Sequence, residues 1–369
     1  MTIASEITDL QTNLANAKSA VTAKGGTVGN TGLAGLASEI NTIPSGGGGG
    51  KTPKDVNFYD LDGTLVESWT VQELASKTAL PANPTPPTGL TALGWNWTLE
   101  DLKTENAPMT VGQVYRPTDE KTHLFVEVDA NHLTPHCSIG LNGTATIDWG
   151  DGTTTTLTGT SLDTDVGSYH TYAQAGSYEV TIELGEGSVG RIRGSRSYVS
   201  FLWKGEQTQS SLTRTNLDYG QQVKKLFIGK NFDFGVVNYG LNYLGIETVT
   251  FPYTPTNYNQ YWVSFCPNLN CAIIIPPNLG DTLGSYFLSG CSSFNNQISI
   301  PKNIENTEQN FMSGCYSFSQ TLVFSSSFSR FNSTNQLYNC DSLKKIIVNT
   351  SAYPSANQTL ATQNLASSA

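Results

Sequence analysis

The second half of the chain contains a repeat whose period restricts the folds open to it. Cysteines recur at intervals of 25, 24 and 25 residues, each at the same place in its repeat, at Cys266, Cys291, Cys315 and Cys340. Each repeat also carries alternating apolar residues, followed in several repeats by a proline, as in Ile298-Ser-Ile300-Pro. A constant period of this length predicts a solenoid of stacked turns, because each repeat then contacts only its neighbours.

The repeat also predicts the chemical state of its cysteines. One cysteine per turn at an equivalent position is expected to be a small buried residue that stacks on its neighbours. We therefore expect free thiols with a structural role. A disulfide between adjacent turns is the alternative, which parallel Cα–Cβ directions disfavour.

Aromatic and amide side chains occupy variable positions of the repeats. Rings combined with Asn and Gln suit recognition of carbohydrate or protein, because they offer apolar area and directional hydrogen bonds at a low entropy cost. The alternative is that the rings fill the narrow core between turns. The receptor-binding candidates are Tyr253, Tyr258, Asn259, Tyr261, Trp262, Tyr286, Tyr316 and Tyr338.

Two motifs resemble known families. Trp149-Gly-Asp-Gly152, with His170-Thr-Tyr172 downstream, resembles the signature of polycystic-kidney-disease-type (PKD) immunoglobulin-like β-sandwiches. We expect Trp149 to fill the core and Asp151 to support a tight turn, with calcium binding there as a minor alternative. The solenoid repeat resembles BspA-like leucine-rich repeats over about 215–350, although its returning segment departs from that family's pattern.

An apolar strand followed by Asp60-x-Asp62-Gly-Thr64 matches the first motif of haloacid-dehalogenase-like phosphatases. In that family the first Asp is the nucleophile and the second is the general acid/base. The sequence that follows is rich in Pro, Thr and Gly and lacks alternating strands and helices, so we reject the enzymatic interpretation. We expect instead a hairpin with the Asp-Gly pair in its turn, between Val56–Tyr59 and Leu65–Trp69. The surrounding run resembles a small module of phage structural proteins and BspA-like proteins.

The N-terminal segment has apolar residues at the spacing of a coiled-coil seam. The segment ends before a proline and a run of five glycines at 46–50. The glycine run indicates a flexible linker. We expect self-association or docking to a larger assembly, with a helical hairpin within the chain as the alternative. The seam consists of Ile3, Ile7, Leu10, Leu14, Ala17 and Val21.

The amino-acid composition of the chain limits the kinds of partner that it is expected to bind. The chain has 20 basic and 30 acidic residues and a net charge of −10, so no nucleic-acid partner is expected. No apolar run approaches the length of a membrane span, and neither a secretory signal nor a C-terminal anchor is recognised. No catalytic residue, metal site or cofactor is expected.

Together these features predict a mainly β, multidomain chain. The expected parts are a helical oligomerisation or virion-docking segment (1–45), a Gly-rich linker (46–53), a small α+β module (54–118), a PKD-like Ig-like β-sandwich (119–204), a BspA-like leucine-rich-repeat solenoid (205–350) and a tail (351–369). This order resembles phage tail, baseplate or capsid-fibre proteins. The expected function is adhesion to a host surface glycan or protein, by a homo-oligomer that docks onto other virion proteins. The alternatives are a bacterial or prophage-encoded adhesin, a capsid decoration protein and, least favoured, the phosphatase.

Overall fold

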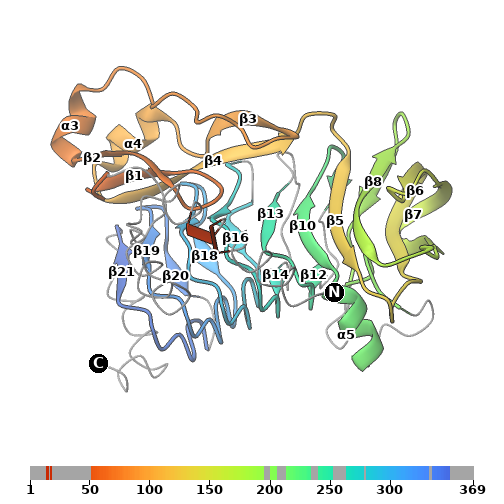
Figure 1. Cartoon of the computed structure of the whole chain (residues 1–369). Coiled ribbons are helices and arrows are strands. Elements are labelled where there is room, and N and C mark those ends of the chain that lie inside the picture. Colours follow the sequence, from red (N-terminus) through yellow and green to blue (C-terminus); the bar gives the residue numbers. More distant parts are fainter. Residues whose placement is uncertain are drawn as a thin grey trace.

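The structure is a computed structural model that describes residues 14–15, 17–18, 51–194, 200–205, 213–233, 240–251, 263–277, 280–331 and 335–349. It is mainly β and contains a β-solenoid of about four turns (Figure 1). The helices of the described residues are short, and none of them is long and apolar enough to cross a membrane. The mainly β class and the solenoid expected from the sequence are thus confirmed.

Residues 51–118 form a four-stranded sheet, which we call the module sheet. Its strand order is β2-β1-β4-β3, with β1 antiparallel to β2 and parallel to β4. Two short helices flank it, and both begin at a threonine whose hydroxyl accepts a backbone N–H of the first turn. The elements are β1 (Val56–Tyr59), β2 (Leu65–Trp69), α3 (Val71–Ser76), β3 (Leu90–Trp95), α4 (Leu99–Glu105) and β4 (Met109–Pro117).

The expected hairpin is present with the expected strand bounds. Asp60 N–H donates to the Thr64 carbonyl at 2.9 Å, and Gly63 N–H donates to the Asp60 carbonyl at 3.0 Å. Gly63 has a φ of +87°, a conformation that glycine adopts without the strain a Cβ would add. Local turn chemistry therefore places the Asp-Gly pair between β1 and β2, as the sequence predicted.

Residues 122–191 form five strands, which we call the β5–β9 unit. Trp149 lies at the end of β6 and is fully buried, as expected. The long β7 pairs along β6 over most of its length, although its Thr/Gly-rich sequence had not been assigned as a strand. All five strands belong to one hydrogen-bonded sheet, and the two-layer Ig-like type stays a prediction. They are β5 (Thr122–Val128), β6 (His136–Asp148), β7 (Thr154–Tyr169), β8 (Gly176–Leu184) and β9 (Val189–Arg191).

The sheet of the β5–β9 unit continues into the solenoid. After α5 (Arg214–Gly220), strand β10 (Val223–Phe227) pairs antiparallel with β5, and β13 (Thr248–Thr250) pairs parallel with β10. Strand β11 (Phe232–Asp233) pairs with β9 at the other end of the sheet. The buried apolar residues of both parts form one continuous cluster. The predicted boundary near residue 204 is therefore crossed by a shared sheet and a shared core.

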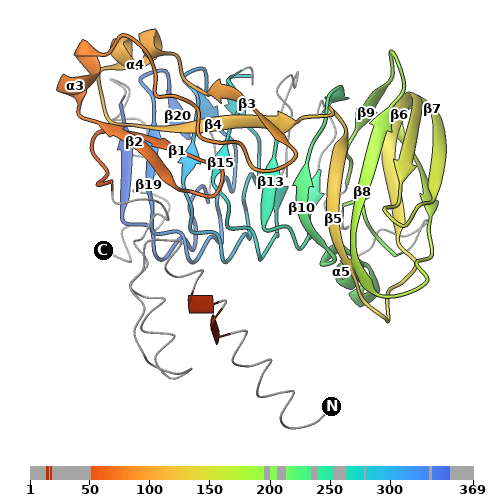
Figure 2. The same cartoon turned by 45° about the horizontal axis from the view of Figure 1, so that its top comes forward.

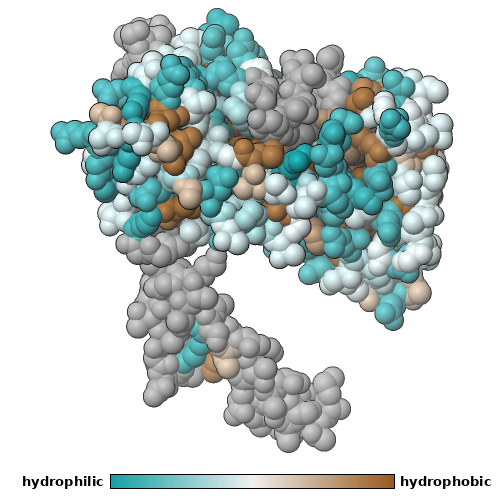
Figure 3. All heavy atoms as spheres, turned by 90° about the horizontal axis from the view of Figure 1, so that it is seen from above, coloured by the Kyte–Doolittle hydropathy of each residue, from teal (hydrophilic) through white to brown (hydrophobic). Residues whose placement is uncertain are grey.

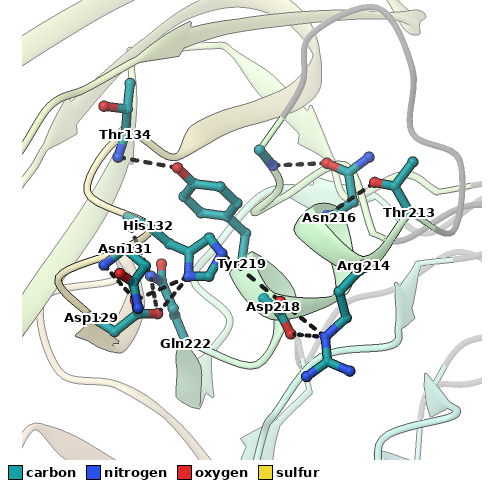
Figure 4. A network of polar contacts seen from close by, with 11 residues as sticks. Asp129, Asn131, His132, Thr134, Thr213, Arg214, Asn216, Asp218, Tyr219 and Gln222 are labelled. Atoms are coloured by element: carbon teal, nitrogen blue, oxygen red, sulfur yellow. Dashed lines mark hydrogen bonds and ion pairs between the residues drawn. The ribbon is translucent and has the colours of Figure 1, made fainter.

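A polar network ties the same junction together on its outer side (Figure 4). Gln222 Nε2 donates to the His132 carbonyl at 2.9 Å, and His132 Nδ1 lies 2.9 Å from Asp129 Oδ2. The Thr134 N–H donates to the Tyr219 hydroxyl at 3.3 Å, which links the loop after β5 to α5. The bonds of Gln222 and Tyr219 join segments 85 to 90 residues apart in sequence, and the His132–Asp129 contact is local.

The solenoid turns stack through short parallel strands. Paired residues are one repeat apart, for example Ile273 with Ile298 and Leu322 with Ile346. Phenylalanines also stack in register, and the Phe294 and Phe318 rings lie 5.5 Å apart with planes 5° from parallel. The strands are β12 (Leu241–Asn242), β14 (Val263–Ser264), β15 (Ile273–Ile274), β16 (Thr282–Leu283), β17 (Ile298–Ser299), β18 (Asn306–Thr307), β19 (Thr321–Phe324), β20 (Arg330–Phe331) and β21 (Lys345–Val348).

The module sheet lies across one face of the solenoid, and β4 crosses the stacked turns (Figure 2). Asn96 Nδ2 donates to the Ile275 carbonyl at 2.9 Å, and Trp97 Nε1 donates to the Ile300 carbonyl at 3.0 Å. At Gly112 an added Cβ would lie 2.6 Å from Ile274 Cγ1, so the two surfaces are in close contact there. The module is therefore packed on the solenoid, an arrangement that the linear order of segments did not predict.

The chain path brings the start of the module to the last solenoid turn. Ile347 of β21 packs against the core cluster that contains Val56 of β1, and Asn349 Nδ2 donates to the Pro108 carbonyl at 3.0 Å, just before β4 begins. From there β4 runs back along the solenoid to β5, which pairs with the first solenoid strand. The β5–β9 unit thus occupies one end of the body, and the start of the module lies at the other end beside β21.

Candidate binding surfaces on the solenoid

The cysteines of the repeat form a buried series that runs along the solenoid. All six cysteines of the chain are free and buried. The thiols of the repeat donate to carbonyl oxygens of the preceding turn, Cys315 Sγ to Leu288 at 3.1 Å and Cys340 Sγ to Met312 at 3.0 Å. Burial raises the pKa of Cys315 and likewise that of Cys266, so these thiols stay protonated and act as hydrogen-bond donors. Their role is to stabilise the stack.

Three of the candidate receptor-binding residues lie in the described part of the solenoid. Tyr316 and Tyr338 are 48% and 44% exposed, and Tyr286 is half-buried with a φ of +63°. Tyr316 and Tyr338 come from neighbouring turns, because Gly314 N–H donates to the Tyr338 carbonyl at 2.8 Å. The other candidates, Tyr253, Tyr258, Asn259, Tyr261 and Trp262, lie outside the described residues.

The N-terminal seam is described only in part. Leu14 and Ala17 are helical and half-buried. Ile3, Ile7, Leu10 and Val21 lie outside the described residues. Oligomerisation or docking through this seam therefore stays a prediction.

The two aspartates of the phosphatase-like motif are engaged in the hairpin turn. Asp60 Oδ1 accepts a hydrogen bond from the Tyr115 hydroxyl at 2.6 Å and another from the Leu61 N–H at 2.7 Å. Asp62 Oδ1 accepts the Thr64 N–H at 2.8 Å. Burial raises the pKa of Asp60, against the effect of these hydrogen bonds. In this arrangement both carboxylates bond to groups of the module itself.

Asp151 supports the turn that follows Trp149. Its Oδ1 accepts the Thr153 N–H at 3.1 Å, and its Oδ2 lies 2.7 Å from His170 Nε2. The His170 ring stacks on Trp149 with ring centres 4.7 Å apart, and the Tyr172 hydroxyl donates to the Trp149 carbonyl at 3.0 Å. Side chains that precede β7 (Asp151) and follow it (His170, Tyr172) thus hold the turn after Trp149 in place. The Trp-Gly-Asp-Gly run therefore has a structural role.

A cleft between the β1–β2 hairpin and the last solenoid turns was missed by the sequence analysis. Its volume is about 460 Å³. On the solenoid side, Gln297 Nε2 donates to Gln320 Oε1 at 2.8 Å, and Gln320 Nε2 donates to Asn295 Oδ1 at 3.2 Å. The 23-residue spacing of Gln297 and Gln320 could have been found in the repeat. The hairpin wall could not, because it comes from a segment more than 200 residues away.

The solvent-facing surface seen from above mixes hydrophilic and neutral residues, with hydrophobic patches that are small and separate (Figure 3). Among the described residues, the exposed large hydrophobic side chains are Tyr169, Tyr316 and Tyr338.

Comparison of the chain with protein-family models, curated proteins and solved structures finds no match. Inferences about function therefore rest on the sequence and on the geometry of the chain.

Proposed function

We propose that this chain is a non-enzymatic structural appendage of a phage virion, which adheres to the host surface through its solenoid. Residues 1–45 dock onto other virion proteins and oligomerise, and the folded body presents the recognition surface. Assignment to a virion is supported by the order of the segments, which resembles the order found in phage tail, baseplate and capsid-fibre proteins. The support for adhesion is the solenoid itself.

The observation that carries the proposal is the pair of exposed tyrosines on neighbouring solenoid turns. Tyr316 and Tyr338 each leave close to half of the side chain open to solvent in a region of the chain with few charges. A tyrosine ring offers apolar area together with a hydroxyl, and loses little conformational entropy when it is immobilised. A rigid, stacked scaffold keeps two such rings at a fixed spacing, which favours binding to a repetitive glycan or a flat protein surface.

Binding of the labelled full chain to a panel of bacterial strains tests the adhesion. We expect saturable binding to a subset of strains, reduced about tenfold or more by Tyr316→Ser combined with Tyr338→Ser, because anchoring aromatic side chains dominate such interfaces. The matched control is Tyr169→Ser, since Tyr169 is 43% exposed but lies on β7. Absence of binding to every strain, or an equal loss in the control, would contradict the proposal.

Immuno-electron microscopy tests the location. Antibody against the chain is expected to label phage particles. Label on the bacterial surface without particles would favour the adhesin alternative.

A further inference from the structure

The cleft between the hairpin and the solenoid has walls from distant parts of the chain. One wall is the β1–β2 hairpin, and the other consists of the turns that carry β17, β19 and β21. Its volume of about 460 Å³ lies within the range of small-ligand sites, roughly 300–1,000 Å³. Because the module is packed on the solenoid, both walls are fixed before any ligand arrives.

On the hairpin wall, the hydroxyl of Tyr59 is available to bond to a ligand. Strand β1 alternates, so Val56 and Phe58 enter the module core while Asn57 and Tyr59 line the cleft. Tyr59 is only 6% exposed, and its hydroxyl has no hydrogen-bond partner among the residues that the structure describes. Burial raises the pKa of Tyr59 to about 12, so the hydroxyl is neutral and can both donate and accept. A hydroxyl on the wall of a cleft can therefore bond to a ligand that enters it.

On the solenoid wall, amides and apolar side chains alternate in a way that suits a sugar. Gln297 and Gln320 are joined to each other through one amide hydrogen bond. Ile347, which is half-buried, adds apolar surface beside them, while Val323 is packed in the core of the module beneath. Fixed amides bond to sugar hydroxyls, and apolar side chains cover the C–H faces of the ring.

One exposed ammonium group at the edge of the cleft favours a ligand that carries an acidic group. Lys51 and Lys54 are paired with Glu67 and Glu73, each at 2.9 Å. Lys345 is exposed at the solenoid edge of the cleft and has no ion pair within the described part of the chain. The acidic residue of the lining, Asp55, accepts the Val71 N–H with Oδ2 at 2.9 Å. With Glu67 and Glu73 included, the three lysines of the lining are matched by three carboxylates, so the position of Lys345, and not a surplus of positive charge, favours an acidic group at the solenoid edge.

We propose that this cleft binds a short acidic oligosaccharide. Lys345 pairs with a carboxylate of the sugar, the Tyr59 hydroxyl and the amides of Gln297 and Gln320 bond to ring hydroxyls, and the apolar wall contacts the ring. The inference rests on the proposed function, because it names the class of host glycan and assigns it to a site separate from Tyr316 and Tyr338.

Calorimetric titration of the full chain tests the cleft. The acidic probes are trigalacturonate, a hyaluronan tetrasaccharide and sialyllactose, and the neutral probe is maltotriose. We expect at least one acidic probe to bind saturably, at least tenfold more tightly than maltotriose and more weakly at high salt. Lys345→Gln is expected to weaken binding by about tenfold or more, because a charge-assisted hydrogen bond is lost. Tyr59→Phe, which removes only the hydroxyl, is expected to weaken it by a few-fold.

Matched controls separate the cleft from general effects. Lys344→Gln removes the neighbouring exposed lysine, which is not part of the cleft lining, and Tyr169→Phe removes the hydroxyl of an exposed tyrosine on β7, also outside the lining. Both controls are expected to bind the acidic probe as the unmodified chain does. The inference is overturned if no acidic probe binds, if maltotriose binds equally well, or if Lys344→Gln and Lys345→Gln weaken binding equally.

The two proposals fail in distinguishable ways. A chain that adheres to bacteria but binds no acidic probe overturns the cleft and leaves the adhesive function standing. A chain that binds an acidic probe but adheres to no strain overturns the adhesive function and leaves the cleft standing.

Discussion

At the scale of single residues, side chains of the solenoid repeats differ in whether they face the core or the solvent. The repeat cysteines are buried donors to the preceding turn, whereas Tyr316 and Tyr338 remain open to solvent. Sequence spacing identifies that a residue recurs in each turn. It does not identify which side of the turn the residue occupies, because a short strand flanked by turns has no long periodicity that separates inside from outside.

Asp60 gives a prediction with a defined dependence on pH. Its pKa is raised in the folded state, so ionisation costs stability as pH rises through the folded pKa, and this cost is absent below pH ~4. Asp60→Asn keeps an oxygen that can accept the Tyr115 hydroxyl and the Leu61 N–H, and removes the charge. We expect the variant to be at least as stable as the parent at pH 7, with the difference vanishing below pH ~4. Urea unfolding at several pH values measures this.

Two further results bear on Asp60. Asp62→Asn is the control, because Asp62 is exposed and its substitution should change stability little at any pH. Greater loss of stability in Asp60→Asn at pH 7 than at pH 3 would contradict the assignment. Magnesium-dependent hydrolysis of a phosphomonoester that disappears in Asp60→Asn would contradict the non-enzymatic proposal.

At the scale of elements, the packing of β4 on the solenoid depends on one position without a side chain. An alanine Cβ at 112 would meet Ile274 Cγ1 at 2.6 Å and Ser299 Cβ at 3.0 Å. Gly112→Ala is therefore expected to destabilise the protein by about 1–3 kcal/mol through overpacking. Ile274→Ala alone is expected to cost about 2–5 kcal/mol through the cavity that it leaves.

The double variant decides whether the two positions are in contact. In Gly112→Ala with Ile274→Ala the new methyl group occupies part of the vacated space, so we expect a loss smaller than the sum of the single losses. Gly176→Ala is the control, because a Cβ there meets its nearest atoms only at 3.5 Å and should be tolerated. Strict additivity in thermal or urea unfolding would show that the module does not pack on the solenoid at this point.

Elements with local signals were predictable, and those without them were not. The hairpin turn was predicted correctly because the Asp-Gly signal acts within a few residues. Strand β7 was missed because Thr and Gly fill it and its partner β6 provides most of its order. The cleft was missed for a related reason, since Tyr59 and Gln320 meet only through tertiary packing.

At the scale of the whole molecule, the shared sheet predicts that the β5–β9 unit and the first solenoid turns unfold together. Leu226 is fully buried and pairs with Leu124 of β5 and Val249 of β13. Leu226→Ala is expected to cost about 2–5 kcal/mol and to lower hydrogen-exchange protection in both β8 and β13. Hydrogen exchange read by mass spectrometry measures both strands in one experiment.

A substitution of the same kind at the other end of the solenoid provides the comparison. Leu322 is also fully buried, and it pairs with Ile346 of the last strand. Leu322→Ala is expected to lower protection in β19 and β21 while β8 stays protected, since repeats pass instability mainly to their neighbours. Unchanged protection of β8 in Leu226→Ala would mean that the two parts fold independently.

The path of β4 determines how the body would respond to a stretching force. A pull along the solenoid axis would strain the hydrogen bonds between turns, which are oriented along that axis and would separate one after another. Strand β4 crosses the same turns as continuous covalent backbone, and nine residues at about 3.3 Å each span about 30 Å, or roughly six strand spacings. A force applied between Lys51 and the β5–β9 unit would therefore pass through the β4 backbone and leave the stacked turns largely unloaded.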